Sequence, residues 1–236
     1  TLTASTETAD GTLAFYVKDL ESGAISTVVT EHYRIDKTAP TGEVRLNERS
    51  AFQTVLNQIS FGLFFNSDVK VELHAADEAS GVKSVQYYKT DRVLTDTEVR
   101  AITGWLDGSD FDVEAEDMEQ FIIYVRIEDN AGNVGYIGSD GAIFDTTAPE
   151  IVGVEDGKIY YVTKRVAADD ENLATVTLNG EPVGTVFSLA GDTDAVYIIR
   201  ATDKAGNETE YTVTMRPIAS ITDAIAEITP ENVKSS

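Results

Sequence analysis

The strongest constraint on the fold is an internal repeat, because three segments of the chain share one alternating pattern. In each segment, the residues two, four and six positions before an aspartate are apolar. The three aspartates are Asp19, Asp129 and Asp203. An alternation with a period of two is typical of a β-strand with one buried face. The nine apolar residues are Leu13, Phe15, Val17, Ile123, Val125, Ile127, Tyr197, Ile199 and Ala201.

Each of these strands leads into a predicted turn. An aspartate carboxylate accepts hydrogen bonds from the backbone N–H groups that follow it, and glycine adopts a positive φ without a Cβ clash. The second and third copies continue as Asp-x-Ala-Gly-Asn at 129–133 and 203–207, whereas the first copy has its glycine one residue later, at Gly23. Each segment therefore predicts a β-hairpin.

Two further motifs recur between the hairpins. Asp-x-Thr-Ala-Pro occurs at 36–40 and 145–149, each time after a hairpin. Proline fixes its own φ and favours extended geometry at the preceding residue, so these segments predict short, stiff connectors. The second motif is Ala-Ala-Asp-Glu at 75–78, which matches Ala-Ala-Asp-Asp at 167–170, and each copy lies between two extended segments.

These motifs in this order resemble bacterial immunoglobulin-like repeats. The resemblance covers about residues 10–217 and includes Ala-Asp-Glu-Ala-Ser-Gly-Val at 76–82. It implies one β-sandwich of the seven-stranded type per unit. It also implies a non-catalytic role in a multidomain bacterial protein, often Gram-positive, that is extracellular and either attached to the cell wall or secreted.

We therefore predict an all-β chain of tandem immunoglobulin-like β-sandwiches with a short, truncated helix at the C-terminus. One hairpin cannot bury a sandwich core, so the first hairpin is expected to be the C-terminal fragment of an upstream unit. The predicted parts are that fragment at 1–40, a domain with two insertions at 41–148, a compact domain at 149–217 and the start of a helical region at 218–236.

Composition excludes several classes of protein. Of the 236 residues, 41 are Asp or Glu and 18 are Lys or Arg, which gives a formal net charge of −23. Such a surface repels nucleic acid and anionic lipid. Cysteine is absent, so disulfides, thiol catalysis and thiolate metal sites are excluded. The sequence has no apolar run of about 18 residues, so we expect no membrane insertion.

The aspartates of the repeated motifs are candidate Ca²⁺ ligands, and no other cofactor is expected. In an immunoglobulin-like sandwich, the loop after the second strand, the last hairpin and the incoming connector lie at the same end. Clustered carboxylates repel one another, and Ca²⁺ would relieve the repulsion. The alternative is that each aspartate only caps its own turn. The predicted sets are Asp36, Asp77 and Asp129, and Asp145, Asp169 and Asp203.

The insertions of the middle domain bring a group of aromatic residues. An exposed aromatic face could stack on a sugar ring. The alternative is that these side chains cover the enlarged core of the domain. The candidate ligand-binding residues are Trp105, Phe64, Phe65, Tyr87 and Tyr88.

The sequence indicates a non-enzymatic protein, since no nucleophile elbow or phosphate-binding loop is present and only two histidines occur. The predicted function is a structural spacer, or stalk, whose partners are the neighbouring domains of the same chain. One alternative is an adhesin or glycan-binding module that uses the aromatic insertions to bind a glycan or a host surface protein. A second alternative is an accessory region of a multidomain secreted glycosidase.

Overall fold

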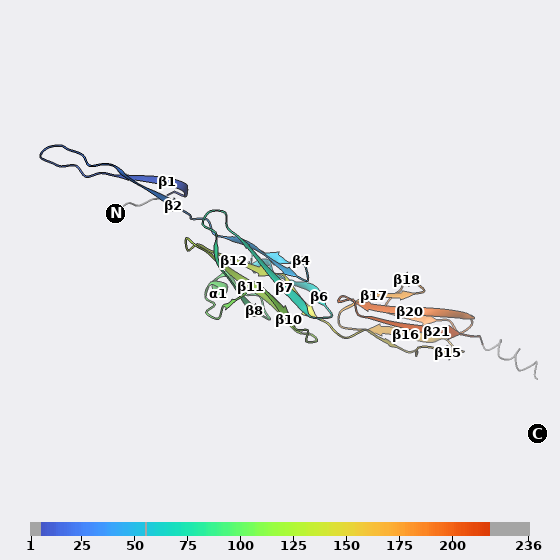
Figure 1. The fold of residues 1–236 in the computed structure, drawn as a ribbon. Helices are drawn as coiled ribbons and strands as arrows, with labels where there is room; N and C mark the ends of the chain where they lie inside the picture. The colour runs from blue at the N-terminus through green and yellow to red at the C-terminus, as the bar shows by residue number, and fades with distance from the viewer. Residues whose placement is uncertain (1–5, 55, 218–236) are drawn as a thin grey trace, which may run out of the picture. The chain divides into compact units, whose positions relative to one another are not determined.

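The computed structural model describes residues 6–54 and 56–217 (Figure 1). Within these residues the chain is almost entirely β, with strands β1 to β21, one short α-helix and one 3₁₀ helix. The predicted all-β fold of tandem sandwiches is therefore confirmed. The predicted helix in 218–236 lies outside the described residues. No helix in the described part of the chain has the length and apolar character needed to cross a membrane.

The chain divides into two compact units. The first unit comprises 1–62, 69–113 and 120–142, and the second comprises 63–68, 114–119 and 143–236. The first unit contains an N-terminal hairpin and most of a large sandwich. The second contains the compact C-terminal sandwich.

The N-terminal hairpin is a two-stranded sheet of β1 (Thr8–Phe15) and β2 (Val29–Ile35). The strands are antiparallel, with Leu13 opposite Glu31 and Phe15 opposite Val29. Within the described residues this sheet contains no other strand.

The large sandwich has two sheets. The smaller has the order β10 (Asp110–Val113), β7 (Val69–Ala76), β3 (Thr41–Leu46) and β4 (Arg49–Ser50). The larger has the order β5 (Phe52–Gln53), β12 (Val134–Ser139), β11 (Gln120–Asp129), β13 (Gly141–Phe144) and β6 (Phe61–Phe65). In that sheet β8 (Val82–Thr90) also pairs with β11 and with β9 (Leu106–Asp107).

The core of the large sandwich lies between these two sheets. Val44 of β3, Val71 of β7 and Ile127 of β11 are all completely buried. In β3 and β7 the other face is more exposed, whereas β11 also buries Ile122 and Tyr124 of its other face in the cluster beside the insertions.

The second insertion of the large sandwich forms α1 (Asp96–Arg100) after β8, and the first contains the 3₁₀ helix η1 (Leu56–Gln58). A capping box begins α1, because the Thr95 side chain accepts a hydrogen bond from the Glu98 N–H while the Glu98 side chain accepts one from the Thr95 N–H. Val99 is buried in a core cluster with Leu94 and Tyr124, so the insertion extends the core on one side.

The compact sandwich also has two sheets. One has the order β14 (Glu150–Val152), β16 (Lys164–Asp169) and β19 (Val186–Leu189). The other has the order β15 (Ile159–Tyr160), β21 (Glu208–Met215), β20 (Ala195–Asp203), β17 (Leu173–Leu178) and β18 (Glu181–Pro182). Val166, Ile199 and Val213 belong to its buried core.

The predicted hairpins are confirmed as β11–β12 and β20–β21. Gly132 and Gly206 both have φ of +92°, which only glycine adopts without strain. These turns place Asp129 and Asp203 at the ends of their strands, where the candidate site begins.

Candidate functional site

The two hairpin aspartates organise their own turns. The Asp129 Oδ1 atom accepts hydrogen bonds from the N–H groups of Ala131 and Asn133 at 2.9 and 2.8 Å. The Asp203 Oδ1 atom accepts hydrogen bonds from Gly206 and Asn207 at 2.7 and 2.9 Å. Asp77 does the same for the N–H groups at 80 and 81. The turn-capping role that the sequence offered as the alternative to metal binding is therefore present.

The asparagine that ends each Asp-x-Ala-Gly-Asn motif contacts the connector. The Asn133 Nδ2 group donates to the backbone oxygen of Asp36 at 3.2 Å. The Asn207 Nδ2 group donates to the backbone oxygens of Asp145 at 2.7 Å and Thr147 at 3.2 Å. Each asparagine also donates to the Oδ2 atom of its hairpin aspartate. In both units a side-chain amide thus joins the last hairpin to the incoming connector.

Sequence reasoning missed this role of Asn133 and Asn207, because it assigned them only to the turn geometry. The sequence did contain an indication of this role. An asparagine follows the turn glycine in both sandwiches that are entered by an Asp-x-Thr-Ala-Pro connector.

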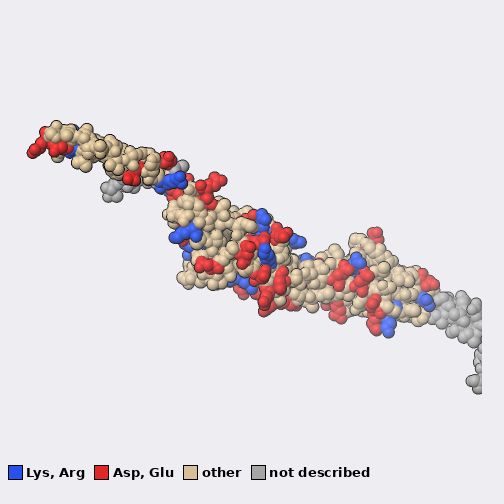
Figure 2. Space-filling model, viewed as in Figure 1, with Lys and Arg blue, Asp and Glu red and all other residues tan. Residues whose placement is uncertain are grey.

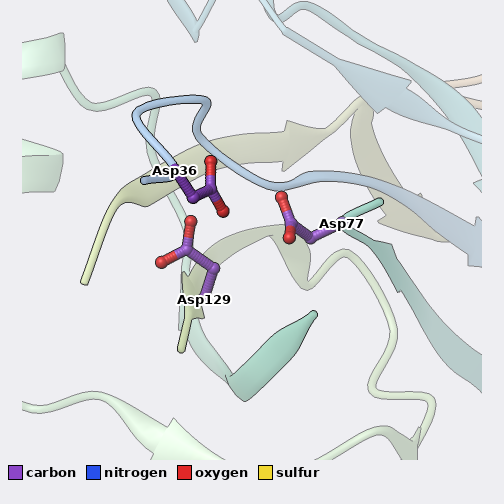
Figure 3. Close-up of side chains that lie close together, drawn as sticks. All are labelled: Asp36, Asp77 and Asp129. Carbon is purple, nitrogen blue, oxygen red and sulfur yellow. The ribbon is translucent and has the colours of Figure 1, made fainter. Parts of the chain in front are cut away.

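The first acidic cluster consists of Asp36, Asp77 and Asp129, as the sequence predicted (Figure 3). One carboxylate oxygen from each residue lies within 4.8 Å of the others. Asp36 comes from the connector, Asp77 follows β7 and Asp129 ends β11, and Figure 3 shows their carboxylates directed toward a shared space. The fold brings together three residues that are far apart in sequence.

Asp36 differs from its two neighbours in how its oxygens are satisfied. Its Oδ1 atom accepts a hydrogen bond from the Thr38 N–H at 2.9 Å. Its Oδ2 atom is buried and accepts no hydrogen bond from the described residues. A buried carboxylate oxygen without a donor or cation is costly, and such atoms are rare in native structures.

The second acidic cluster contains Asp145, Asp170 and Asp203, so the prediction of Asp169 is wrong by one residue. Asp169 is still part of β16, where it is exposed and pairs with Glu150. The equivalent pair in the large sandwich is Ala76 with Thr41, so the structural match of Asp77 is Asp170. The buried strand residues Leu73 and Val166 each lie four positions before Asp77 and Asp170. Matching the strands by these buried residues, instead of by the Ala-Ala-Asp motif, would have selected Asp170.

The second cluster also contains an amide donor. The Asn172 Nδ2 group donates to the Asp145 Oδ2 atom at 2.9 Å, and both residues are buried. An amide donor partly neutralises the carboxylate, so this cluster is satisfied from within the protein in a way that the first is not.

One residue in each cluster has a shifted pKa. Burial would raise the pKa of Asp129, but the hydrogen bonds from Asn133, Gly132 and Ala131 together lower it below the ordinary value. Burial raises the pKa of Asp170, and the charges of Asp145 and Asp203 add to the increase. Figure 2 shows acidic side chains spread over the visible face of the described chain, so the field around these clusters attracts cations.

Two of the predicted aromatic residues cover the core of the large sandwich. Tyr88 and Trp105 pack against the cluster that contains Val99 and Tyr124. Their ring centroids are 6.4 Å apart in an edge arrangement. Trp105 also lies 6.1 Å from the ring of Tyr136. This packing corresponds to the structural alternative for these residues.

The other predicted aromatic residues lie elsewhere. Tyr87 stacks on Phe111 with centroids 3.9 Å apart. Phe65 is buried, and the Lys204 amino group lies 5.0 Å from the centroid of Phe64. Tyr87 and Tyr88 are adjacent in β8, so their side chains point to opposite faces. The structure does not bring the five candidate residues together into one platform.

The two histidines are both exposed and lie outside the two acidic clusters. His32 is exposed on the first hairpin, where its Nδ1 atom lies 3.3 Å from Asp10. His74 is exposed on β7. Neither histidine belongs to an acidic cluster, so the candidate sites offer only oxygen ligands.

Comparisons with known proteins found distant similarities of fold. No family model matches the chain, and no curated protein matches it. The fibronectin(III)-like modules of Clostridium thermocellum CbhA match with a TM-score of 0.38 and 10% identity, covering 74% of this chain and 93% of theirs.

Two further structures match at similar distance. The chicken CNTN1 FN1–FN3 domains have a TM-score of 0.30 and 10% identity, covering 87% of this chain and 77% of theirs. The Bacteroides ovatus SGBP-B protein, in complex with a mixed-linkage heptasaccharide, has a TM-score of 0.30 and 11% identity, covering 77% of this chain and 48% of its own. These similarities are too distant to support an argument about function.

Proposed function

We propose that the chain is a non-catalytic spacer built from tandem immunoglobulin-like sandwiches. The observation that carries this proposal is the contact between each hairpin asparagine and the connector, from Asn133 to Asp36 and from Asn207 to Asp145 and Thr147. These hydrogen bonds fix the start of the connector to the sandwich that it enters. Together with the restricted φ of Pro40 and Pro149, they limit bending at the connector.

The proposed domain division follows the motifs: 1–40, 41–148, 149–217 and 218–236. Residues 1–40 would be the last hairpin of an upstream unit, since the exposed apolar face of this hairpin corresponds to the buried faces of β11–β12 and β20–β21. The neighbouring domains of the same protein would then be the main partners of the chain.

The non-catalytic part of the proposal is supported by the chemistry of the described residues. Neither histidine belongs to an acidic cluster, and the clustered Asp129 and Asp203 each accept hydrogen bonds from their own turns. We further propose an extracellular location, on a bacterial cell wall or in secreted form. The acidic surface suits such a location because it keeps a long chain soluble.

The glycan-binding alternative is less well supported, because the candidate aromatic residues are dispersed and two of them pack on the core. The accessory role in a secreted glycosidase concerns a larger protein, and the properties of this chain suit it equally. In that role too, the chain would act as a spacer.

The stiffness of the connector tests the proposal. Because the chain has no cysteine, spin labels can be attached at Thr97→Cys and Asp194→Cys, two exposed positions in different units. Double electron–electron resonance should give a narrow distance distribution that broadens in Asn207→Ala and in Pro149→Gly. A broad distribution in the parent chain would reject the spacer role, and a glycan array on the same chain would test the rival.

A further inference from the structure

We propose that residues 221–228 form a short amphipathic helix that packs on the outer face of the five-stranded sheet of the compact sandwich, the face directed away from its core. This inference goes beyond the spacer role and does not depend on it, because a spacer needs no such contact. It rests on a comparison of the two sandwiches and on the sequence that follows β21.

Part of this outer face is apolar. Val196 and Ile198 of β20 are 57% and 44% exposed, and Ile159 of β15 is 42% exposed. Thr214 of β21 lies directly opposite both Ile159 and Val196, so the three side chains form one row across three strands. The solvated face of a sheet is normally polar, and a contiguous apolar patch indicates a contact surface.

The large sandwich shows what covers the equivalent positions. Val196 lies seven residues before its hairpin aspartate, as Ile122 of β11 does. By the same count, Ile198 corresponds to Tyr124. Ile122 and Tyr124 are completely buried, in a cluster that includes Val99 of α1. The insertion that contains α1 therefore covers this face of the large sandwich.

The compact sandwich lacks this insertion. Within the described residues it contains no helix, and its loops between β17 and β20 hold only the short strands β18 and β19. The cover for Val196 and Ile198 must then come from another segment. The chain continues past β21 directly beside this patch, because Thr214 belongs to the row and β21 ends at Met215.

The sequence after β21 has the pattern that such a cover requires. Four apolar residues recur at the spacing i, i+3, i+4 and i+7, which places them on one face of a helix. Asp223 and Glu227 fall on the opposite face, and Pro230 ends the pattern. A helix this short is marginal alone in water, so it needs a surface to pack against. The four apolar residues are Ile221, Ala224, Ile225 and Ile228.

The dimensions allow the chain to fold back onto the sheet. Residues 216–220 can span up to about 17 Å, which is enough to turn from the end of β21 onto the outer face. A helix over 221–228 is about 12 Å long. The row from Ile159 to Val196 crosses two strand spacings, or about 10 Å. One face of the helix therefore matches the length of the apolar row.

Disulfide trapping in the full chain tests the contact, because the chain has no cysteine of its own. Ile225→Cys is combined with Val196→Cys or with Ile198→Cys, and the dilute protein is oxidised. We expect a crosslink within one molecule, seen as a faster-migrating monomer on a non-reducing gel. The matched control combines Ile225→Cys with Thr202→Cys, on the same strand and face but about 20 Å from Val196.

A disulfide requires Cα atoms within about 7 Å, so the control pair should stay reduced. Crosslinking that is equal in the control overturns the proposal, as does the absence of a crosslink at both positions. Crosslinks that form only between molecules also overturn it, and they would assign the apolar face to a second copy of the chain.

Hydrogen exchange in the cysteine-free chain gives an independent readout. The amides of 221–228 should exchange at least about tenfold more slowly than those of an unstructured peptide. Val196→Asp should abolish this protection, because it places a charge under the helix, whereas Thr202→Asp should preserve it. Both positions lie on the outer face, so β20 and β21 should stay protected in either variant. Unprotected amides in the parent chain, or protection that survives Val196→Asp, overturn the proposal.

Discussion

The chain contains the same hairpin three times. Within the described residues, the apolar face is buried in a sandwich core in the second and third hairpins but not in the first. Val17 of the first hairpin is 74% exposed, whereas Ile127, at the equivalent position of the large sandwich, is completely buried. Phe15 is 47% exposed, and its counterparts Val125 and Ile199 are 1% and 0% exposed. The alternation is the same in all three copies, so it specifies which face is apolar but not what covers that face.

This difference separates local from tertiary contributions to stability. The turn of the first hairpin forms around Asp19 as the others form around Asp129 and Asp203. Its strands, however, contribute no buried core within the described residues. A two-stranded hairpin alone is only marginally stable in water. The first hairpin is therefore an internal reference for what the hairpin motif provides without a second sheet.

The largest expected contrast is in the core. Ile127→Ala should destabilise the large sandwich by about 2–5 kcal/mol, because it leaves a cavity beside β3 and β12. The matched Val17→Ala change should cost at most about 0.5 kcal/mol, since its side chain is already in water. Urea unfolding followed by the fluorescence of Trp105, the one tryptophan of the chain, measures the first.

Hydrogen exchange of the amides in the first hairpin measures the effect of Val17→Ala. A large loss of protection around Val17 in Val17→Ala would contradict the comparison. It would mean that this face is covered in solution.

The next contrast is in the turn aspartates. Asp203→Ala removes the acceptor of three hydrogen bonds at a buried site, which should cost about 1–3 kcal/mol. Relief of repulsion with Asp145 and Asp170 offsets part of that cost. Asp19→Ala removes an acceptor that serves an exposed turn, where water replaces it, so we expect a much smaller loss of stability than in Asp203→Ala.

Hydrogen exchange across β20–β21 and across the first hairpin provides both measurements for the aspartate pair. Equal losses in the two variants would show that burial does not decide the value of these hydrogen bonds.

A smaller effect is expected at the connector. Asn207→Ala removes the donor to Asp145 and Thr147 and should cost about 1 kcal/mol, mostly by loosening the connector. The first hairpin has Ala24 after its turn glycine, so it lacks such a donor. Amide exchange at 145–147 should accelerate in Asn207→Ala while the core of the compact sandwich keeps its protection. Unchanged exchange at the connector would remove the physical basis for a stiff junction.

The sequence was sufficient to predict the strands and turns that depend on local rules. Period-two alternation identified β11 and β20, and the Asp-x-Ala-Gly-Asn motif identified the turns that follow them. The grouping of Asp36, Asp77 and Asp129 also followed from sandwich topology.

What the sequence could not predict depends on register and packing. The cluster contains Asp170 and not the predicted Asp169, because β16 ends at Asp169 whereas β7 ends one residue before Asp77. A motif match does not resolve this difference of one residue. Asn172 lies in the loop after β16, and the matching loop after β7 supplies no such donor to Asp36. The separation of Tyr87 from Tyr88 depends on which face of β8 each one occupies. These features require the partner strand to be known.

The smallest predicted effect concerns the pH dependence of the first turn. The N–H groups of Ser22 and Glu21, with the Ser22 hydroxyl, lower the pKa of Asp19 below its ordinary value of 3.8. Because the folded pKa is the lower one, the turn's contribution to stability is present above pH 3.8 and is lost as the pH falls through the folded pKa. The carboxyl carbon shift of Asp19, followed by NMR from pH 6 to pH 2, measures the folded value. A midpoint below 3.8 means that the turn persists without a covering sheet, whereas a midpoint at 3.8 means that the hairpin forms only when its apolar face is buried.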